Sequence, residues 1–387
     1  MTKTQKNAIG IAWVALMIWG LIGVMQRLLY GHLRADYGSY VPWGLWVASK
    51  IYFIGLAEGV SFFAWVCYAF QIERFRELVR PALWLSLVNM VVGLMIISFD
   101  LGHMGRLQEV FFRPNFSSLL TISSWLSMGY MAYIAVILTM EVKSYPLSTK
   151  TYRLLGWIGM ALAIIFSGGN GAEFATLISS PYWHTALGPV LSIGYALSSG
   201  LALILAVAAF FYFTDSSKER ETLALLSRTV VGLLFLVIIL EWSEFSVTMW
   251  YGRDRTYTVL WSILFGPYWY VFWIVHLLAG VIIPLVMLIR KPANRLNAGW
   301  AGLLIAVAHF AVRLNHVIPG QVTPAMKGLQ EAYTDNRLKF EYFPSIHEWS
   351  VFAFAVALFI ALFYLGIRFL PILSTKSVNE AVNEGGN

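Results

Sequence analysis

Long apolar runs, separated by short polar or basic clusters, follow one another along nearly the whole sequence. A run of about 20 mostly apolar residues is long enough to cross a bilayer as a helix. Such runs cover residues 8–29, 44–70, 81–103, 117–141, 154–178, 186–213, 226–250, 262–289, 298–318 and 347–370. The pattern predicts an all-α integral membrane protein with about ten transmembrane helices, forming a single polytopic membrane domain over residues 1–387. Pro81 is expected in the first turn of the third helix, where proline is well tolerated.

Similar polar segments recur at equivalent helix ends. The segments ISFDLGHMGRLQEVFF and ILEWSEFSVTMWYGR both place acidic residues at the same end of a predicted helix. This recurrence predicts two four-helix bundles, built from repeat units 44–178 and 186–318, together with two extra helices.

Composition agrees with a membrane protein and argues against other classes. Hydrophobic residues make up 59% of the chain and charged residues 12%, whereas a soluble domain has roughly 25% charged residues. The net charge of +7 is explained by basic loops, and we expect no nucleic-acid partner. The single cysteine, Cys67, cannot supply the four thiolates of an ordinary iron–sulfur cluster, so any such cluster is expected in a partner. The first apolar run continues through Met25 without an obvious cleavage site and is read as a retained helix.

Basic residues predict the orientation in the membrane. Each loop between spans on the side of the N-terminus carries three of them: Arg74, Arg76 and Arg80; Lys143, Lys150 and Arg153; Lys218, Arg220 and Arg228; Arg290, Lys291 and Arg295. Cytoplasmic loops are enriched in Lys and Arg. We therefore expect a multi-pass protein of a prokaryotic cytoplasmic (inner) membrane, with both termini cytoplasmic.

Several ionisable residues lie inside the apolar runs. A charge near the centre of a bilayer costs at least about 2.5–3.5 kcal/mol, so such residues are expected to face a protein interior or a water-filled path. One group falls toward the extracytoplasmic ends of the helices: Lys50, Asp100, His103, Glu173, Glu241, Glu244 and Arg313. Glu241 and Glu244 are three residues apart and share a helix face. A structural ion pair, such as Lys50 with Glu173, is the alternative for any one residue, but the whole set indicates a polar pocket.

Glu58, His276 and His309 lie nearer to the middle of the membrane. Carboxylate and imidazole groups can pass protons through intervening waters, so these three residues are candidates for a proton path. For either histidine alone, an interhelical hydrogen bond is the alternative. The two histidines form at most one pair of haem ligands and CxxCH is absent, so we expect no haem in this chain. The glycines of SGGNGAEF permit either close helix packing or a break in the fifth helix.

Two segments on the predicted extracytoplasmic side, residues 100–117 and 314–347, are rich in aromatic and apolar residues. Such composition is unusual for solvated linkers. They are either docking surfaces for an extracytoplasmic partner or loops folded over the helix ends.

The chain resembles the NrfD/PsrC family, the membrane subunits of polysulfide reductase-like complexes, and in particular its ten-helix DsrP/HybB-type branch. The resemblance rests on VPWGLWVASKIYFIGLAEG, FDLGHMGRLQEVFFRPNF, LEWSEF, FGPYWYVFWIVHLLAGVIIPLVML and VRLNHVIPGQ followed by YFPSIHEW. These segments occur in this order over nearly the whole chain.

The resemblance implies a membrane-anchoring, quinone-reactive subunit of a multisubunit respiratory oxidoreductase. Such a subunit exchanges electrons with a ferredoxin-like iron–sulfur subunit on the extracytoplasmic face, which is connected to a molybdopterin enzyme, a hydrogenase or a multihaem cytochrome. Menaquinone or ubiquinone would be the substrate, and proton transfer is a further expectation. In this reading Asp100, His103, Glu173, Glu241 and Glu244 act as proton acceptors. Lys50, Asp100, His103 and Arg313 would bind the quinone head group.

Lys50 and Glu58 depart from the family pattern, because the second helix usually reads GLSAGSF where this chain has GLAEGVSF. Both changes add charge beside the expected quinone site. The alternative is therefore a quinone-independent proton conduit and anchor for a hydrogenase or reductase complex, similar to the OmeB type. A substrate transporter is a third reading, in which the docking loops have no role.

Overall fold

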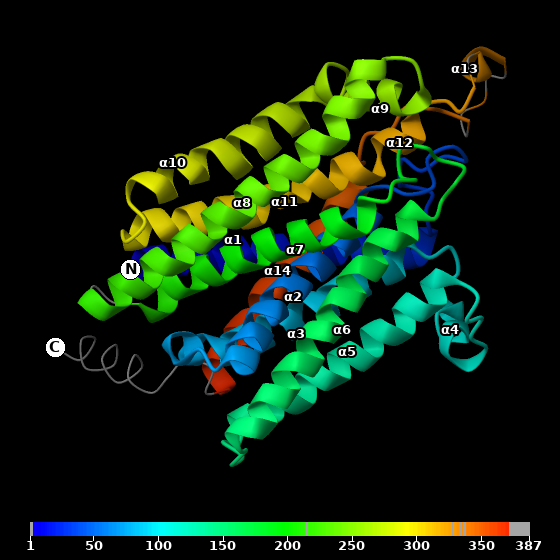
Figure 1. Cartoon of the computed structure of the whole chain (residues 1–387). Helices are drawn as coiled ribbons and strands as arrows, with labels where there is room; N and C mark the ends of the chain where they lie inside the picture. The colour runs from blue at the N-terminus through cyan, green and yellow to red at the C-terminus, as the bar shows by residue number, and fades with distance from the viewer. Residues whose placement is uncertain (1–2, 214–215, 327, 333–334, 336–337, 371–387) are drawn as a thin grey trace.

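The computed structural model describes residues 3–213, 216–326, 328–332, 335 and 338–370, and these residues form helices and connecting loops without a strand. Within the described residues ten helices are long and apolar enough to span a membrane (Figure 1). They are α1 (Lys3–Tyr30), α2 (Leu45–Phe70), α3 (Arg76–Asp100), α5 (Leu119–Val142), α6 (Thr149–Ala175), α7 (Gly188–Val207), α8 (Ser217–Tyr251), η4 (Val271–Ile282) continued by α10 (Ile283–Arg290), α11 (Arg295–Val317) and α14 (Ile346–Phe369). The predicted all-α membrane fold is confirmed.

Shorter helical segments connect or extend these spans. They are η1 (Glu73–Phe75), η2 (Met104–Arg106), α4 (Glu109–Phe112), η3 (Ala208–Tyr212), α9 (Arg255–Leu264), α12 (Pro319–Val322) and α13 (Leu329–Ala332). Both η3 and η4 are π-helical, whereas η1 and η2 are 3₁₀ turns. A π-helical stretch as long as η4 is rare, and π segments occur frequently at functional sites.

The prediction that Pro81 begins the third span is wrong. Helix α3 starts at Arg76 and contains Pro81, whose missing N–H leaves the carbonyl of Glu77 without its usual donor. Glu77 itself lies in the first turn, where a negative charge is favourable near the exposed backbone N–H groups. The basic segment before Pro81 is thus part of the helix rather than a loop.

The helices are arranged as two groups of four that meet along a seam, with α1 and α14 outside them. In the first group α2 and α5 each contact α3 and α6; in the second group α8 and α11 each contact α7 and the η4–α10 helix. Helix α2 also packs on α7 and α11, which forms the seam between the groups. The predicted arrangement of two four-helix bundles plus two extra helices is confirmed, whereas the internal repetition stays a prediction.

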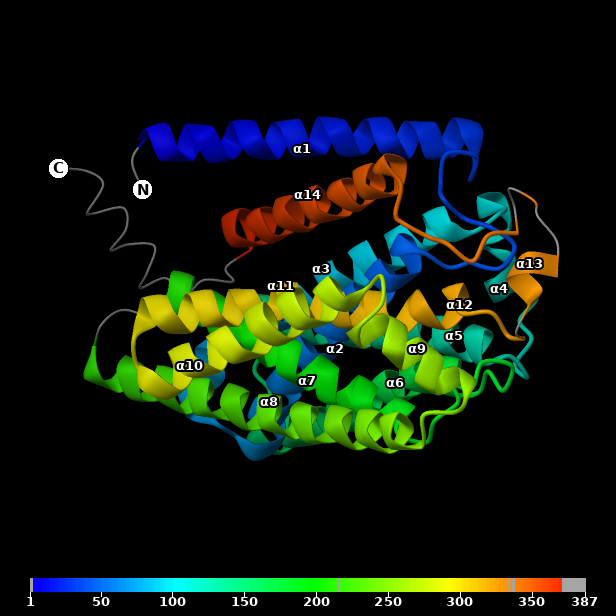
Figure 2. The same ribbon diagram turned by 90° about the horizontal axis from the view of Figure 1, so that it is seen from above.

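Helices α1 and α14 form a pair at the edge of the molecule (Figure 2). Trp13 Nε1 donates a hydrogen bond to the carbonyl oxygen of Ala357 at 2.9 Å. At the end of α1 the buried Arg27 donates to the carbonyl oxygens of Phe99 and Leu101, at 2.5 and 2.6 Å. A cation at these last carbonyls of α3 is favourable because they carry partial negative charge.

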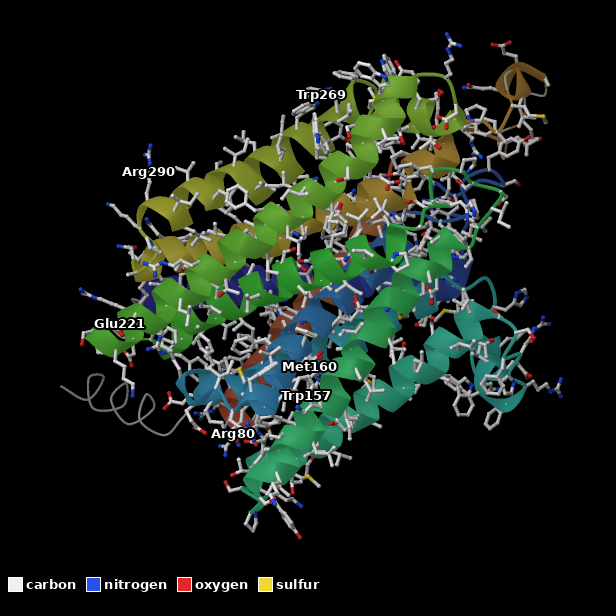
Figure 3. All side chains as sticks on the ribbon, in the orientation of Figure 1. Arg80, Trp157, Met160, Glu221, Trp269 and Arg290 are labelled. Carbon is white, nitrogen blue, oxygen red and sulfur yellow. The ribbon has the colours of Figure 1, made fainter. Side chains whose placement is uncertain are left out.

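The molecule has two ends. We call the end with the start of α1 and the finish of α14 the terminal face, and the end with α4, α9, α12 and α13 the loop face (Figures 1 and 2). Side chains of Arg80, Glu221 and Arg290 lie toward the terminal face, and Trp269 lies toward the loop face (Figure 3). On the loop face, part of segment 314–347 is folded over the helix ends, since Gln321 bonds the backbone N–H and C=O of Trp43, at 3.0 and 2.7 Å.

Candidate functional site

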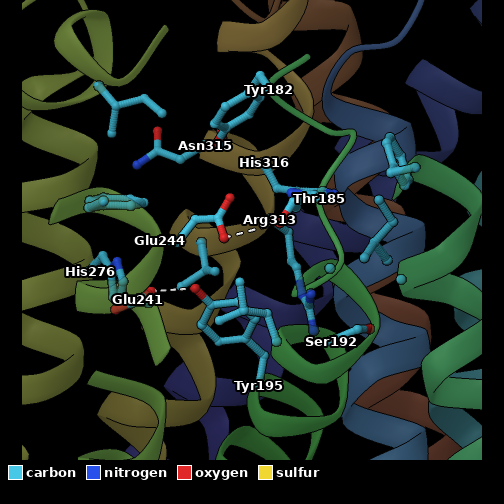
Figure 4. Close-up of a pocket in the computed structure, with 18 of the residues that line it drawn as sticks. Tyr182, Thr185, Ser192, Tyr195, Glu241, Glu244, His276, Arg313, Asn315 and His316 are labelled. Carbon is cyan, nitrogen blue, oxygen red and sulfur yellow. Dashed lines mark hydrogen bonds and ion pairs between the residues drawn. The ribbon is translucent and has the colours of Figure 1, made fainter. Parts of the chain in front are cut away.

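A cavity lies in the seam between the two bundles, and we call it the inter-bundle cavity. Helices α2, α6, α7, α8, α9, η4 and α11 and the α6–α7 loop line it. Its volume, taken at the centres of water-sized spheres, is about 80 Å³, which is room for several waters. Its polar lining comprises Asn170, Tyr182, Thr185, Ser192, Tyr195, Glu241, Glu244, His276, Arg313, Asn315 and His316 (Figure 4). Four residues predicted from the sequence, Glu241, Glu244, His276 and Arg313, are brought together here.

Glu241 is the most highly connected acid of the cavity. The hydroxyl of Tyr195 on α7 donates to its Oε1, and Nε2 of His276 on η4 lies 3.5 Å from the same oxygen. Side chains from three helices therefore meet at one carboxylate oxygen. A carboxylate, a phenol and an imidazole in contact form a network that can accept and redistribute a proton.

Glu244 points into the same cavity one helical turn further along α8 (Figure 4). Its Oε2 accepts a hydrogen bond of 3.1 Å from the hydroxyl of Thr185 in the loop between α6 and α7. The predicted shared face of Glu241 and Glu244 is confirmed, since both line the cavity.

Arg313 brings a buried positive charge to the opposite wall. Its side chain is 6% exposed, and its guanidinium carbon lies 5.2 Å from the centre of the Tyr195 ring, a cation–π contact. A Cβ on Gly55 would lie 2.9 Å from Nη2 of Arg313, so this glycine leaves space for the guanidinium. Among the described carboxylates none forms an ion pair with Arg313. The cation is thus held beside the cavity by packing.

Asn315 has the least satisfied polar side chain in the cavity wall. It is 7% exposed, and neither its Oδ1 nor its Nδ2 has a hydrogen-bond partner within the described part of the chain. Burying such groups without partners costs about 1–3 kcal/mol. An amide presenting both a donor and an acceptor to a cavity is suited to a ligand or waters that carry complementary groups.

Lys50 and Glu58 are connected to the cavity through Asn170. Lys50 Nζ lies 3.2 Å from Oε2 of Glu173 and 3.2 Å from Oδ1 of Asn170. Asn170 in turn donates from Nδ2 to Oε1 of Glu58 at 2.5 Å. The ion pair considered from the sequence is confirmed, and a continuous polar chain runs from Glu173 to Glu58. Asn170 itself lines the cavity.

His309 lies behind the cavity wall. Its Nδ1 donates to the carbonyl oxygen of Ile305 at 2.9 Å, and its Nε2 is 3.0 Å from the hydroxyl of Ser198. Because a carbonyl only accepts, Nε2 of the neutral ring accepts from Ser198. Both ring nitrogens are therefore engaged by protein groups, in agreement with the interhelical hydrogen bond considered above.

Asp100 and His103 do not line the inter-bundle cavity. Asp100 accepts a hydrogen bond of 2.9 Å from the hydroxyl of Tyr37, near the end of α1, and burial together with the charge of Asp100 raises the pKa of Tyr37. His103 is exposed in the loop after α3. They lie apart because α3 packs against α2, α5 and α14, so its end meets the first helix rather than the seam.

Three cavity residues were not identified from the sequence: Asn170, Tyr195 and Asn315. Asn170 is three residues from Glu173, and Asn315 lies between Arg313 and His316, so helical spacing from charged residues was an available signal. Tyr195 stands in an apolar run, GYALSSG. Only the packing of α7 against α8 directs it to Glu241.

Comparison with known proteins gives consistent relatives over nearly the full length. One is a membrane-protein relative from the selenate reductase of Mesobacillus selenatarsenatis, which is 28% identical, and the alignment covers 93% of each chain. The Hdr-like menaquinol oxidoreductase integral membrane subunit of Archaeoglobus fulgidus is 26% identical, over 89% of this chain and 88% of the relative. The probable Ni/Fe-hydrogenase 2 b-type cytochrome subunit of Escherichia coli is 24% identical, over 94% and 92%.

The family profile described as polysulphide reductase, NrfD, matches residues 35–325. This range holds the two bundles, the seam and all the residues that line the inter-bundle cavity. The match covers well over half of the sequence and agrees with the family that the sequence segments resemble. The chain belongs to the NrfD polysulphide reductase family.

Proposed function

We propose that this chain is the membrane-anchoring, quinone-reactive subunit of a multisubunit respiratory oxidoreductase. The relatives support this, since one is a menaquinol oxidoreductase membrane subunit and others are named as subunits of a selenate reductase and of a hydrogenase. The observation that carries the proposal is the inter-bundle cavity, where the unpartnered amide of Asn315 faces two acids and a buried arginine. A quinone offers oxygen atoms that accept hydrogen bonds, and a quinol offers hydroxyl groups that donate them.

The residues of the cavity can divide the chemistry between them. Oxidation of a quinol releases two electrons and two protons. Glu241, coupled to His276, and Glu244 accept protons, which is the work of general bases placed next to the reacting group. Arg313 and Asn315 donate hydrogen bonds to the head-group oxygens, and a fixed cation stabilises negative charge that develops there. Asp100 and His103 lie outside this cavity, and their predicted role remains a separate proposal.

The partners follow from the same proposal. The loop face would be extracytoplasmic and would dock a ferredoxin-like iron–sulfur subunit, connected to a molybdopterin enzyme, a hydrogenase or a multihaem cytochrome. Both termini would then be cytoplasmic, in a prokaryotic inner membrane. That this chain holds no haem is supported by His309, whose two ring nitrogens are both engaged by Ile305 and Ser198.

The test is quinone content and quinol oxidation in the native complex. We expect purified complex to contain menaquinone or ubiquinone. Glu241→Gln should slow quinol oxidation by about 10²–10⁴-fold, the usual contribution of a general base. Asn315→Leu should raise the KM for quinol by roughly 5–150-fold, since losing hydrogen bonds there costs about 1–3 kcal/mol.

The matched control is Asn89→Leu, which replaces another buried asparagine, on α3 and outside the cavity. It should leave the KM unchanged. An intact, active complex that neither contains nor needs quinone would refute the proposal.

A second function is favoured by one observation, the polar chain through Glu173, Lys50, Asn170 and Glu58. Titratable groups in series suit a quinone-independent proton conduit that anchors a hydrogenase or reductase. The same preparation distinguishes the two functions: full turnover after quinone extraction supports the conduit, and turnover restored only by added quinone supports the first proposal.

A further inference from the structure

A second hollow opens on the loop face, and we call it the loop-face groove. It is formed by the segment before α2, the loop between α6 and α7, the start of α9, and the region of α12 and α13. The lining residues that matter here are Tyr40, Trp43, Ser180, Trp183, Arg255 and Phe340. None of them belongs to the inter-bundle cavity.

The groove carries a positive charge without an acidic partner. Arg255 donates to the carbonyl oxygens of Ser179, Gly320 and Thr323 at 2.9–3.2 Å, which ties the α6–α7 loop to α12. Its Nε is buried without an acceptor within the described part of the chain. Burial lowers the pKa of Arg255, and no described carboxylate is close enough to oppose that change.

An unpartnered hydroxyl lies in the same groove. The side chain of Ser180 is 5% exposed, and its Oγ has no hydrogen-bond partner among the described residues. A buried hydroxyl and a buried N–H without acceptors are unfavourable unless something completes them. An anionic oxygen would satisfy both.

The walls of the groove are aromatic. The rings of Tyr40 and Phe340 are stacked, with centroids 4.2 Å apart, and Trp43 and Trp183 are 5.7 Å apart. Such surfaces bind well to an extended peptide, because they provide large contact area with little loss of side-chain freedom.

Only one layer of aromatic side chains separates the groove from the inter-bundle cavity. Phe174 lines the cavity, and its ring contacts both Trp43 and Trp183, at 5.7 and 5.4 Å between centroids. Trp183 Nε1 also donates to the carbonyl oxygen of His316, a cavity residue, at 2.7 Å. A partner seated in the groove is thus as close to the cavity as this layer allows.

We propose that the loop-face groove receives an acidic segment of the extramembrane redox subunit, with one carboxylate of that segment on Arg255 and Ser180. The inference rests on the proposed function for the existence of that subunit, and it adds the place and the chemistry of docking. Charge complementarity selects the carboxylate, and the aromatic walls hold the chain on either side of it. Electron exchange with the cavity then crosses the single aromatic layer.

The first experiment maps what lies in the groove of the native complex. A photo-crosslinking amino acid replaces Ala325, an exposed residue that lines the groove, or Ala332, an exposed residue outside it. We expect Ala325 to crosslink to one peptide of the extramembrane subunit that contains Asp or Glu, and Ala332 not to do so. Crosslinks to lipid or to a second copy of this chain would overturn the proposal.

The second experiment measures docking through variants. Ala325→Trp fills the groove and should weaken retention of the extramembrane subunit by at least about 10-fold, whereas Ala332→Trp should not change it. Ser180→Ala removes a hydroxyl that has no partner among the described residues, so the free chain should keep its thermal stability while the affinity for the partner falls by about 10-fold, the scale of one charge-assisted hydrogen bond. Full retention in both variants would contradict the proposal.

Quinone content in the same preparations separates the two proposals. Partner loss with normal bound quinone supports the groove as a docking site and leaves the proposed function intact. Absence of quinone from wild-type complex, with the crosslink still formed, overturns the proposed function and supports the groove.

Discussion

Lys50 and Glu58 are the two most unusual residues of α2, and Asn170 explains how the helix accommodates them. The sequence placed Lys50 with an outer set of acids and Glu58 with deeper groups. In the structure the amide of Asn170 accepts from Lys50 and donates to Glu58, at 3.2 and 2.5 Å. A single amide on α6 therefore connects the two depths, and the charge of Lys50 is offset by Glu173.

This pairing leads to a prediction about stability. The side chains of Lys50 and Glu173 are 15% and 13% exposed, so removing one partner leaves a nearly buried charge. Lys50→Met or Glu173→Met alone should destabilise the chain by about 3–5 kcal/mol, whereas the double substitution should recover most of that loss. Thermal unfolding of the detergent-solubilised chain measures the three variants.

The exposed pair Arg113 and Glu109, four residues apart at 3.4 Å, provides the control. Its double replacement should change stability by less than about 1 kcal/mol, as is usual for surface ion pairs. Additive losses in the Lys50 and Glu173 double variant would show that the two charges do not compensate each other.

The sequence allowed depth to be predicted, but not the neighbours of each side chain. Counting about 1.5 Å per residue correctly placed Glu241, Glu244 and Arg313 at one level, and they share a cavity. The same counting placed Asp100 at that level, yet α3 turns it toward Tyr37. Which helices adjoin depends on packing between distant segments, so the positions of Tyr195 and Asn315 in the cavity could not be derived.

At the scale of elements, the crossing of α2 and α7 is the tightest contact of the seam. A Cβ on Gly59 would lie 1.7 Å from the carbonyl oxygen of Ala196, and one on Gly200 would lie 2.4 Å from the carbonyl carbon of Gly59. The two backbones are thus in direct contact, which only glycine permits at these positions. Glu58 is adjacent to this crossing, so the position of its carboxylate depends on it.

Gly59→Ala should therefore push α2 away from α7 and destabilise the chain by about 1–3 kcal/mol or more, the usual result of overpacking. Gly169→Ala on α6 is the matched control, because a Cβ there has nothing within 4 Å and should stabilise the helix by about 0.5–1 kcal/mol. Both are measured by thermal unfolding in detergent. Equal stability of Gly59→Ala and wild type would show that the seam can relax.

Apolar runs were sufficient to predict the ten spans, because the requirement for about 20 apolar residues is independent of neighbouring helices. Local departures from regular helix were not predictable in the same way. The π-helical geometry of η4, which holds His276 against Glu241, has no sequence signature as plain as an apolar run. Helix α6 runs unbroken through its glycines, and Gly171 packs against Pro189 and Ser192, so close packing explains that glycine.

At the scale of the whole molecule, the seam between the bundles is where polar chemistry is concentrated. The first bundle contributes Asn170 and the second contributes Tyr195, Glu241, His276 and Arg313. Such a site needs both bundles to be complete, and the loop-face groove lies across the same seam. The architecture thus places the proposed redox site and the proposed docking site in line along one direction through the membrane.

That direction can be tested by labelling intact cells. The excess of basic residues in the loops of the terminal face predicts that this face is cytoplasmic. Cys67, the single cysteine, is buried, so the native chain gives little background with a membrane-impermeant maleimide. Ser117→Cys, exposed on the loop face, should be labelled in intact cells, and Thr149→Cys, exposed on the terminal face, only after permeabilisation. The reverse pattern would place the loop face in the cytoplasm, and the docked iron–sulfur subunit would then have to be a cytoplasmic protein.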